Sequence, residues 1–323
     1  MSEYHIPVLL AESISALITN PDGTYADATF GGGGHTAAIL SRLHGAGRVI
    51  AFDRDIDAIA GALKDPRLTL IHNNFRFIEN YAEQLRREEA SASLPGASAL
   101  EASEGPAVFD GILADLGVSS HQFDTAERGF SFRFEDAPLD MRMNREARLT
   151  AAQVVNTYPE EELERILRLY GEVDGARNMA RLITQARSVQ EISTTGDLDR
   201  AIARMLPGNA EHKVLAKVYQ ALRIEVNQEM RSLEKFLDGA ARSLKPGGRL
   251  VVITYHSLED RMVKNFIKAG NVDGQMHADV YGRVQAPLEA VNRKPILPSE
   301  EEIAGNTRAR SAKLRIAQRR AEA

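Results

Sequence analysis

The chain has 323 residues, of which 43% are hydrophobic and 26% are charged, as in an ordinary soluble globular protein of one large domain or two. It contains no cysteine, which excludes disulfides, thiolate metal sites and thiol nucleophiles, and its net charge of −5 argues against indiscriminate nucleic-acid binding. No apolar run suits a signal peptide or a membrane span, so we expect a cytoplasmic protein that does not bind membranes.

The N-terminal part of the chain begins with alternating strands and helices. We predict a strand over Tyr25–Phe30, a helix over His35–Leu43 and a second strand over Arg48–Phe52. Four glycines, residues 31–34, join the first strand to the helix, where they let the backbone approach a ligand beside free N–H groups. Asp53 follows about twenty residues later, where an acid can bind ribose hydroxyls. This order predicts an adenosine-binding crossover.

Asp27, just ahead of the glycines, helps to decide which adenosine cofactor is bound. In nicotinamide and flavin enzymes the helix start receives a pyrophosphate, which a carboxylate at this point would repel. A carboxylate suits a ligand with a cationic amine, such as the methionine part of S-adenosylmethionine. We therefore expect Asp27 to contact S-adenosylmethionine; the alternative is that it caps a turn in a flexible glycine loop.

Two further strands are predicted over Leu68–His72 and Val108–Leu113. Between them, residues 86–107 are rich in Ala, Ser and Glu, which predicts an exposed, mobile connection. Asp115 follows the strand predicted over Val108–Leu113, where its carboxylate should face the transferable methyl group. Amino methyltransferases often have an Asn/Asp-Pro-Pro-Tyr/Phe motif at this position, and the chain resembles them in the acid but not in the prolines or the ring. In such enzymes a hydrogen bond from an exocyclic base amine to the carboxylate would orient the nitrogen and favour its nucleophilic form. We predict that Asp115 is catalytic; the alternative is a turn-forming aspartate.

The alternation of strands and helices stops after Phe134. Residues from about 148 to 205 are helical in pattern, and a long helical stretch over Val214–Leu244 leads through a Leu244–Gly248 turn to a strand over Arg249–Thr254. We predict an α/β fold with a Rossmann-like class I methyltransferase sheet. Its two segments, residues 1–134 and 210–323, bind S-adenosylmethionine and flank an inserted helical substrate-recognition domain at residues 135–209.

The last predicted strand is followed by His256, which could be a proton acceptor, an RNA ligand or a structural residue bonded to Glu259. Metal-ligand spacing is absent from the sequence, so we expect no metal site. The basic residues are clustered rather than spread. Arginines surround Phe130, Phe132 and Phe134, where the alternatives are RNA contact or phenylalanines buried in the core. Other basic residues gather in residues 306–323, where the alternatives are phosphate contact or a solvated basic tail.

Eight segments carry a resemblance to a known family. In chain order they are HIPVLLAE (His5–Glu12), DATFGGGGHT (Asp27–Thr36), AFDRD (Ala51–Asp55), DGILADLGVSSHQFD (Asp110–Asp124), ERGFSFRFEDAPLDMRM (Glu127–Met143), YQALRIEVNQE (Tyr219–Glu229), GGRLVVITYHSLEDR (Gly247–Arg261) and TRARSAKLRIAQR (Thr307–Arg319). Together they resemble the MraW/RsmH family of small-subunit ribosomal RNA cytosine-N4 methyltransferases. The departures are few: Tyr219 and Tyr255 stand where the family usually has Phe, Thr307 replaces a Pro, and the Ala/Ser/Glu-rich segment near 90–105 is longer than usual.

The resemblance implies transfer of a methyl group from S-adenosylmethionine to the N4 amine of one cytosine in the decoding region of 16S ribosomal RNA, within the small ribosomal subunit. Seven residues carry over as cofactor contacts: Gly33, Gly34, His35, Asp53, Phe75, Asp115 and Gln122. The sequence does not determine the oligomeric state, and a homodimer is one of the possibilities. Three alternative functions remain: an amino methyltransferase acting on DNA or a small molecule, a non-catalytic RNA-binding ribosome assembly factor, and a nicotinamide oxidoreductase.

Overall fold

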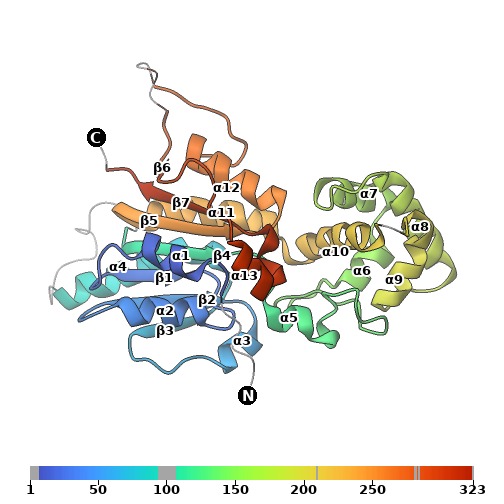
Figure 1. The fold of residues 1–323 in the computed structure, drawn as a ribbon, viewed down its shortest axis with the longest axis horizontal. Helices are drawn as coiled ribbons and strands as arrows, with labels where there is room; N and C mark the ends of the chain where they lie inside the picture. The colour runs from blue at the N-terminus through green and yellow to red at the C-terminus, as the bar shows by residue number, and fades with distance from the viewer. Residues whose placement is uncertain (1–6, 94–106, 209, 280–281, 283, 322–323) are drawn as a thin grey trace. The chain divides into compact units, whose positions relative to one another are not determined.

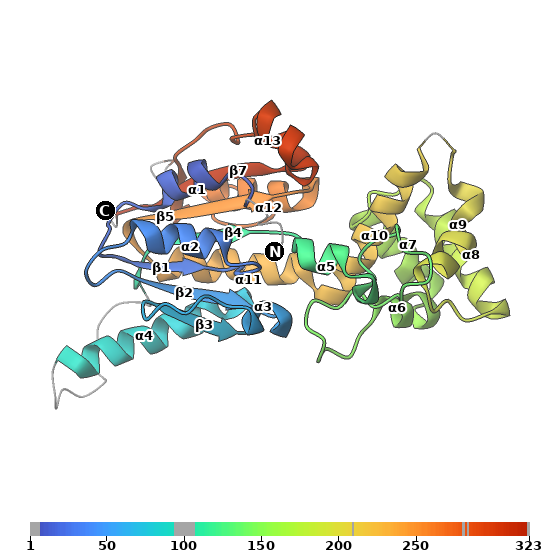
Figure 2. The ribbon, with the colours of Figure 1, turned by 60° about the horizontal axis from the view of Figure 1, so that its bottom comes forward.

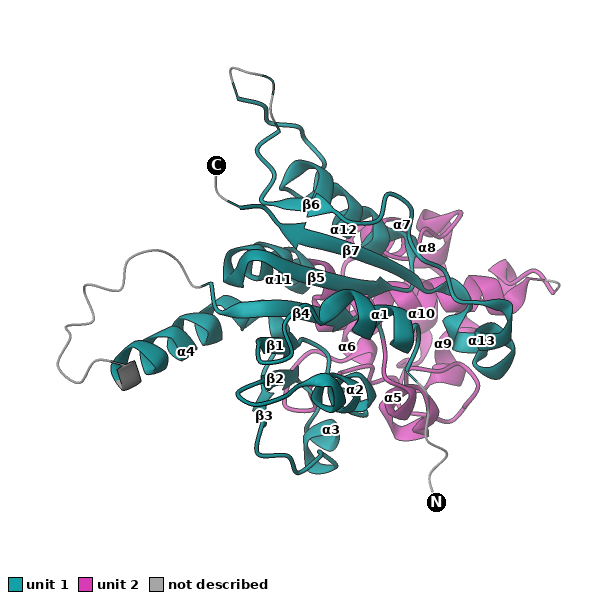
Figure 3. Ribbon diagram, turned by 60° about the vertical axis from the view of Figure 1, so that its left-hand side comes forward, with its two compact units in different colours: residues 1–117, 231–323 teal, residues 118–230 magenta. Residues whose placement is uncertain are grey.

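The computed structural model describes residues 7–93, 107–208, 210–279, 282 and 284–321 (Figure 1). The chain forms two compact units, one from residues 1–117 and 231–323 and the other from Val118–Met230 (Figure 3). The second unit contains the predicted insertion at 135–209 and extends beyond it at both ends. The unit covers more of the sequence than the predicted insertion for two reasons. At its C-terminal end, α10 (Glu211–Asn227) packs against α6 (Ala151–Thr157) and α7 (Glu160–Leu169), and at its N-terminal end Phe130 joins the same core.

A single sheet organises the described part of the first unit. Its strand order is β3-β2-β1-β4-β5-β7-β6. The strands are β1 (Thr24–Asp27), β2 (Arg48–Asp53), β3 (Leu68–His72), β4 (Phe109–Asp115), β5 (Leu244–Thr254), β6 (Leu288–Ala290) and β7 (Lys313–Arg319). Strands β1 to β5 pair in parallel, whereas β7 is antiparallel to β5 and β6. The chain moves outward from β1 to β3, then returns to β4 on the other side of β1, so the strand order reverses between β1 and β4.

Helices cover both faces of this sheet (Figures 1 and 2). The side chains of each strand alternate between two cores. In β4, Leu113 packs with α1 (Leu10–Leu17) and α2 (Gly34–Arg42), while Ile112 and Ala114 pack with α4 (Ile78–Ser93), α11 (Glu229–Ser243) and α12 (Ser257–Ala269). Because both faces are buried, the central strands read as continuous apolar runs. The remaining short elements of this unit are α3 (Ile56–Ala60), η1 (Phe75–Phe77), α13 (Glu300–Gly305) and η4 (Thr307–Ser311).

The predicted strands at 48–52, 68–72 and 108–113 are confirmed to within two residues. The prediction for the first strand, Tyr25–Phe30, was too long. The strand ends at Asp27, because the Asp27 carboxylate accepts the backbone N–H of Thr29 and turns the chain. The predicted turn at Leu244–Gly248 is part of β5, whose pairing with β4 shifts register between Phe109 and Gly111.

One predicted connection was wrong in its first part, and one predicted helical stretch is confirmed as helical but interrupted. Residues 86–93 belong to α4, because the Arg, Glu and Ala in this stretch are good helix formers; the rest of the predicted connection, 94–106, lies outside the described residues. The long helical stretch at 214–244 is divided into α10 and α11. The division falls at Gln228, whose φ of 50° is incompatible with a continuous α-helix.

The second unit is helical, as predicted, and its described residues contribute no strand to a sheet. Its further helices are α5 (Ser120–Asp124), η2 (Ala126–Arg128), α8 (Ala176–Val189), α9 (Thr195–Ile202) and η3 (Ala203–Met205). Their apolar faces form one core. Across the described residues of both units, no helix combines the length and the apolar character needed to cross a membrane.

Candidate active site

Three of the predicted site residues end parallel strands at the carboxyl edge of the sheet. Asp27 ends β1, Asp53 ends β2 and Asp115 ends β4. The first two strands flank each other, and β4 lies on the other side of β1. Open α/β sheets bind ligands beyond this edge, at the point where the strand order reverses. The structure therefore gathers these three carboxylates where such sheets hold their ligands.

The glycine turn connects β1 to α2. Gly31 and Gly33 have φ angles of 51° and 76°, a conformation that glycine adopts readily and other residues rarely do. Gly33 is the N-cap of α2, and a Cβ at Gly34 would lie only 2.3 Å from Cγ of Pro7. The first N–H groups of α2, which include that of His35, have no acceptor within the helix. This turn can therefore bring backbone donors close to a polar ligand.

Two carboxylates hold the turn in place. Asp53 accepts the backbone N–H of Gly31 at 2.7 Å and that of Asp55 at 2.8 Å, while burial raises the pKa of Asp53. Asp27 is fully buried, and it accepts the Thr36 hydroxyl at 2.6 Å. Burial also raises the pKa of Asp27. Asp27 thus has the turn-stabilising role that the sequence left open, and its contact with a cationic amine stays a prediction.

Asp115 is held by three neighbouring groups. Its backbone N–H donates to Oγ1 of Thr29 at 2.7 Å. Its Oδ1 accepts the hydroxyl of Tyr255 at 2.8 Å, and its Oδ2 lies 3.7 Å from Nδ1 of His35. The Asp115 side chain is nevertheless 22% exposed, compared with 5% for His35. The carboxylate is therefore fixed in position but still accessible from solvent.

The electrostatic surroundings of Asp115 set its charge. Burial raises its pKa to about 6, while the nearby His35 and the hydrogen bond from Tyr255 oppose this rise. Burial and the adjacent Asp115 raise the pKa of Tyr255 far above its ordinary value. At neutral pH, Asp115 is therefore mostly ionised and Tyr255 is a hydroxyl donor.

The other predicted cofactor residues lie in different places. Phe75 is in η1, partly buried, with its ring 5.1 Å from that of Phe236 in an edge-to-face arrangement. Gln122 belongs to the second unit, where it closes a capping box with Ser119 at the start of α5. Contact of Phe75 and Gln122 with the cofactor stays a prediction.

His256 begins α12 as its N-cap, and its Nε2 lies 3.0 Å from Oε1 of Glu259. Neither ring nitrogen has an aligned hydrogen-bond partner in the described part of the chain, so this short distance is a contact rather than a well-formed hydrogen bond. The contact agrees with the structural role that the sequence left open for His256.

Sequence reasoning missed two residues that hold Asp115. Thr29 falls within the predicted strand Tyr25–Phe30, and Tyr255 stands out in the sequence only as a departure from the family pattern. A signal was present for Tyr255, because it directly follows β5, which pairs with β4 up to Asp115. No local pattern, however, indicates a hydrogen bond between side chains 140 residues apart.

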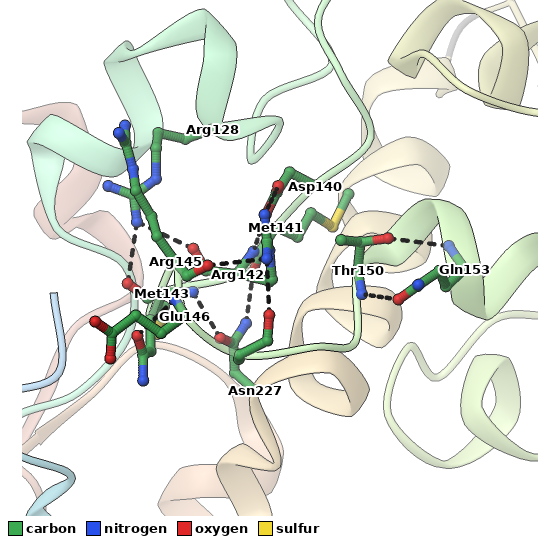
Figure 4. A network of polar contacts seen from close by, with 12 residues as sticks. Arg128, Asp140, Met141, Arg142, Met143, Arg145, Glu146, Thr150, Gln153 and Asn227 are labelled. Carbon is green, nitrogen blue, oxygen red and sulfur yellow. Dashed lines mark hydrogen bonds and ion pairs between the residues drawn. The ribbon is translucent and has the colours of Figure 1, made fainter.

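A polar network in the second unit fixes the loop at residues 138–147 (Figure 4). Asn227 accepts the backbone N–H of Met143 at 2.8 Å and donates to the carbonyl of Met141 at 2.7 Å. Arg128 donates to the carbonyls of Arg142 and Met143 at 3.0 and 3.1 Å. Met141 itself has a φ of 60° and a fully buried side chain. The loop is therefore held by buried hydrogen bonds in a conformation that few non-glycine residues adopt.

The predicted arginine–phenylalanine cluster contains both buried and exposed residues. Arg128 and Phe130 are buried and structural, which agrees with the alternative weighed for the phenylalanines. Arg142 forms an ion pair with Asp140. Arg133 and Arg145 are exposed, and Arg133 pairs with Asp124 at 3.0 Å. Phosphate contact by these two arginines stays a prediction.

The basic residues near the C-terminus are not a solvated tail. Lys313 and Arg315 lie in β7, and both pair with Asp260 of α12, with Arg315 Nε 2.7 Å from Oδ1. Of this group, Arg310 and Arg320 are exposed. Phosphate contact by these two stays a prediction.

Comparison with known proteins identifies the family. The family model described as "MraW methylase family" matches residues 2–320. A relative from Bacteroides fragilis (strain YCH46), named "Ribosomal RNA small subunit methyltransferase H", is 53% identical over 317 residues, which cover 98% of each chain. Proteins with the same name from Bacteroides thetaiotaomicron and Flavobacterium johnsoniae are 52% and 50% identical, again over 98% of both chains. The chain belongs to the MraW methylase family.

Proposed function

We propose that this methylase transfers the methyl group of S-adenosylmethionine to the exocyclic N4 amine of one cytosine in the decoding region of 16S ribosomal RNA. The observation that carries the proposal is the Asp115 carboxylate, which is fixed at the end of β4 and remains 22% exposed. Family membership and the names of the relatives support a ribosomal RNA substrate.

The residues around the glycine turn fit S-adenosylmethionine. The turn packs tightly on the protein and cannot carry a side chain at Gly33, since a Cβ there would lie 2.8 Å from the Phe30 ring. Nearby, Nε2 of His35 is buried without a hydrogen-bond partner in the described structure. Gly34 and His35 would offer backbone donors, whereas the N–H of Gly33 already donates to the carbonyl of Phe30 at 2.7 Å and shapes the turn. Asp53 would bind the ribose hydroxyls. When bound, S-adenosylmethionine supplies an electrophilic methyl group.

Asp115 would act on the amine of the cytosine. The amine lone pair is delocalised into the ring, which makes the nitrogen a poor nucleophile. By accepting an N–H, the carboxylate orients the nitrogen and favours its pyramidal form, and the fixed position of Asp115 lowers the entropic cost of alignment. An amine that has gained a methyl group is cationic and loses a proton readily. A carboxylate with a pKa of about 6 is therefore basic enough for this role.

The second unit would recognise the RNA, as predicted for the inserted domain. It exposes Arg133, Arg145 and Arg148, and the network around Asn227 fixes the loop at residues 138–147, which carries Arg145. Arginines on a rigid loop can bind phosphates at low entropic cost. A cytosine within structured RNA must also leave its stack before its amine can reach a carboxylate. We propose that the substrate is the assembled small ribosomal subunit.

The test uses S-adenosylmethionine with a radiolabelled methyl group. The purified protein is incubated with small ribosomal subunits from cells that lack this enzyme, with naked 16S RNA and with DNA, and the product is digested to nucleosides. Label in N4-methylcytidine from the subunits supports the proposal. Label only in DNA would support the DNA methyltransferase alternative, and binding to subunits without any transfer would support an assembly factor.

A further inference from the structure

We propose that Tyr255 is a positioning residue for the acceptor carboxylate: its hydroxyl holds Oδ1 of Asp115, favours the ionised form and leaves Oδ2 to meet the substrate amine. The inference rests on the proposed function for the identity of the substrate. The contact itself is a 2.8 Å hydrogen bond between two side chains of the first unit.

The position of the Tyr255 ring is fixed by its surroundings. Its backbone N–H donates to Oε2 of Glu259 at 2.9 Å, which anchors the residue at the end of β5. The ring lies against Gly117, where a Cβ would be 3.2 Å from Cδ2 and where φ is 103°. The ring also packs against the apolar core beneath α1 and α2. The Tyr255 side chain is therefore fixed by contacts at the ends of β4 and β5, and its hydroxyl has a defined position.

Asp115 faces four titratable groups on four elements. Asp27 at the end of β1 and Glu259 on α12 disfavour its ionised form, whereas His35 on α2 and Tyr255 favour it. The His35 nitrogen is 3.7 Å from the carboxylate, beyond hydrogen-bonding distance, so Tyr255 is the closer of the two favourable partners. Loss of the Tyr255 hydroxyl would leave Asp115 beside two carboxyl groups with only the more distant His35 to oppose them.

The hydrogen bond also assigns chemical roles. Tyr255 keeps its proton throughout the working pH range, so it donates and does not act as the base. Because Oδ1 is engaged by Tyr255, the amine is expected to approach Oδ2, on the side of Asp115 nearer His35. Tyr255 acts on the substrate only through Asp115.

The variant Tyr255→Phe removes the hydroxyl and keeps the ring. We expect the pKa of Asp115 to rise by about one unit, because one hydrogen bond to a carboxylate typically shifts its pKa by about that amount. The first measurement is a 13C NMR titration of the protein with labelled aspartate side chains, in which Asp115 is identified by the signal missing from Asp115→Asn. This measurement needs neither cofactor nor RNA.

The second measurement is the pH dependence of methyl transfer. A one-unit shift predicts a loss of about fivefold near pH 6 and less than twofold near pH 8.5, with the acid limb moved to higher pH. Tyr158→Phe is the matched control, because it also removes a hydroxyl that donates to a carboxylate, that of Glu225, at 2.9 Å. It should leave both the Asp115 titration and the acid limb unchanged.

The two measurements separate the failure of this inference from the failure of the proposed function. An unchanged Asp115 titration in Tyr255→Phe would overturn the role of Tyr255, whatever the substrate. A loss of activity that is equal at all pH values, with no shift in the titration, would also overturn it. If the wild-type protein transferred no methyl group to RNA while the titration shifted, the proposed substrate would fail and the role of Tyr255 in setting the charge of Asp115 would stand.

Discussion

Replacing Asp115 with asparagine should stabilise the protein at neutral pH while it removes the acceptor carboxylate. The pKa of Asp115 is raised by burial from its ordinary value of 3.8 to about 6. A carboxyl group whose pKa is higher in the folded state stabilises the fold when it is protonated. That stabilisation is present at low pH and is lost as the pH rises from about 4 to about 6.

The pKa difference gives the size of the effect. A shift of about two units corresponds to about 3 kcal/mol between low and neutral pH at 1.36 kcal/mol per unit. Because the side chain is 22% exposed, we expect about 1–2 kcal/mol in practice. Asparagine has nearly the same shape and still accepts the Tyr255 hydroxyl, so the variant avoids this cost without opening a cavity.

The assay is urea-induced unfolding followed by far-UV circular dichroism, since the chain contains no tryptophan for fluorescence. The midpoint of Asp115→Asn should exceed that of the wild type at pH 7.5, and the two should converge as the pH approaches 4. Asp260→Asn is a control of opposite sign. Although burial favours a higher pKa, Arg315 and Lys313 hold the pKa of Asp260 below its ordinary value, so this variant should be less stable at pH 7.5. Equal or lower stability of Asp115→Asn at pH 7.5 would refute the reasoning.

Three further variants test other parts of the structure. Gly34→Ala places a Cβ 2.3 Å from Cγ of Pro7 and should weaken S-adenosylmethionine binding in calorimetry at least tenfold, whereas Gly61→Ala, with open space around its Cβ, should bind as the wild type does. Asn227→Ala leaves a buried backbone donor and acceptor unpaired and should lower the free energy of unfolding by about 2–4 kcal/mol, measured in urea. The exposed Asn178 is its control, and equal effects of the two alanine substitutions would contradict the assigned role of the network. Arg133→Ala should weaken RNA binding and reduce the slope of log affinity against log salt by about one; an unchanged slope would remove Arg133 from the RNA contacts.

Much of the first unit could be predicted from local patterns. The strands β2 and β4 are short apolar runs that end in a polar residue, and these signals survive because both faces of the sheet are buried there. The edge strand β3 is only partly buried, and it mixes Leu and Ile with Thr and His. The glycine turn could be predicted because glycine readily adopts positive φ angles, as Gly31 and Gly33 do just before α2. The inserted helical unit followed from the loss of strand signals after Phe134.

The misjudged parts depend on contacts that are distant in sequence. The strand β7 alternates Leu314 and Ile316 with basic residues. Its charges are compatible with phosphate contact or with a solvated tail, whereas Lys313 and Arg315 pair with Asp260 of α12. The division between α10 and α11 falls at Gln228, without the glycine or proline that marks many helix ends. The hydrogen bond from Tyr255 to Asp115 depends on the pairing of β4 with β5, which no local sequence pattern specifies.

The most direct test of the central claim, that Asp115 is the acceptor of the substrate amine, compares methyl transfer and RNA binding in Asp115→Ala and the wild type. We predict that turnover on small ribosomal subunits falls at least ~100-fold, the usual scale for the loss of a positioned catalytic group, while the dissociation constant for the subunit changes less than about threefold. Turnover within about twofold of the wild type at normal RNA affinity would contradict the account.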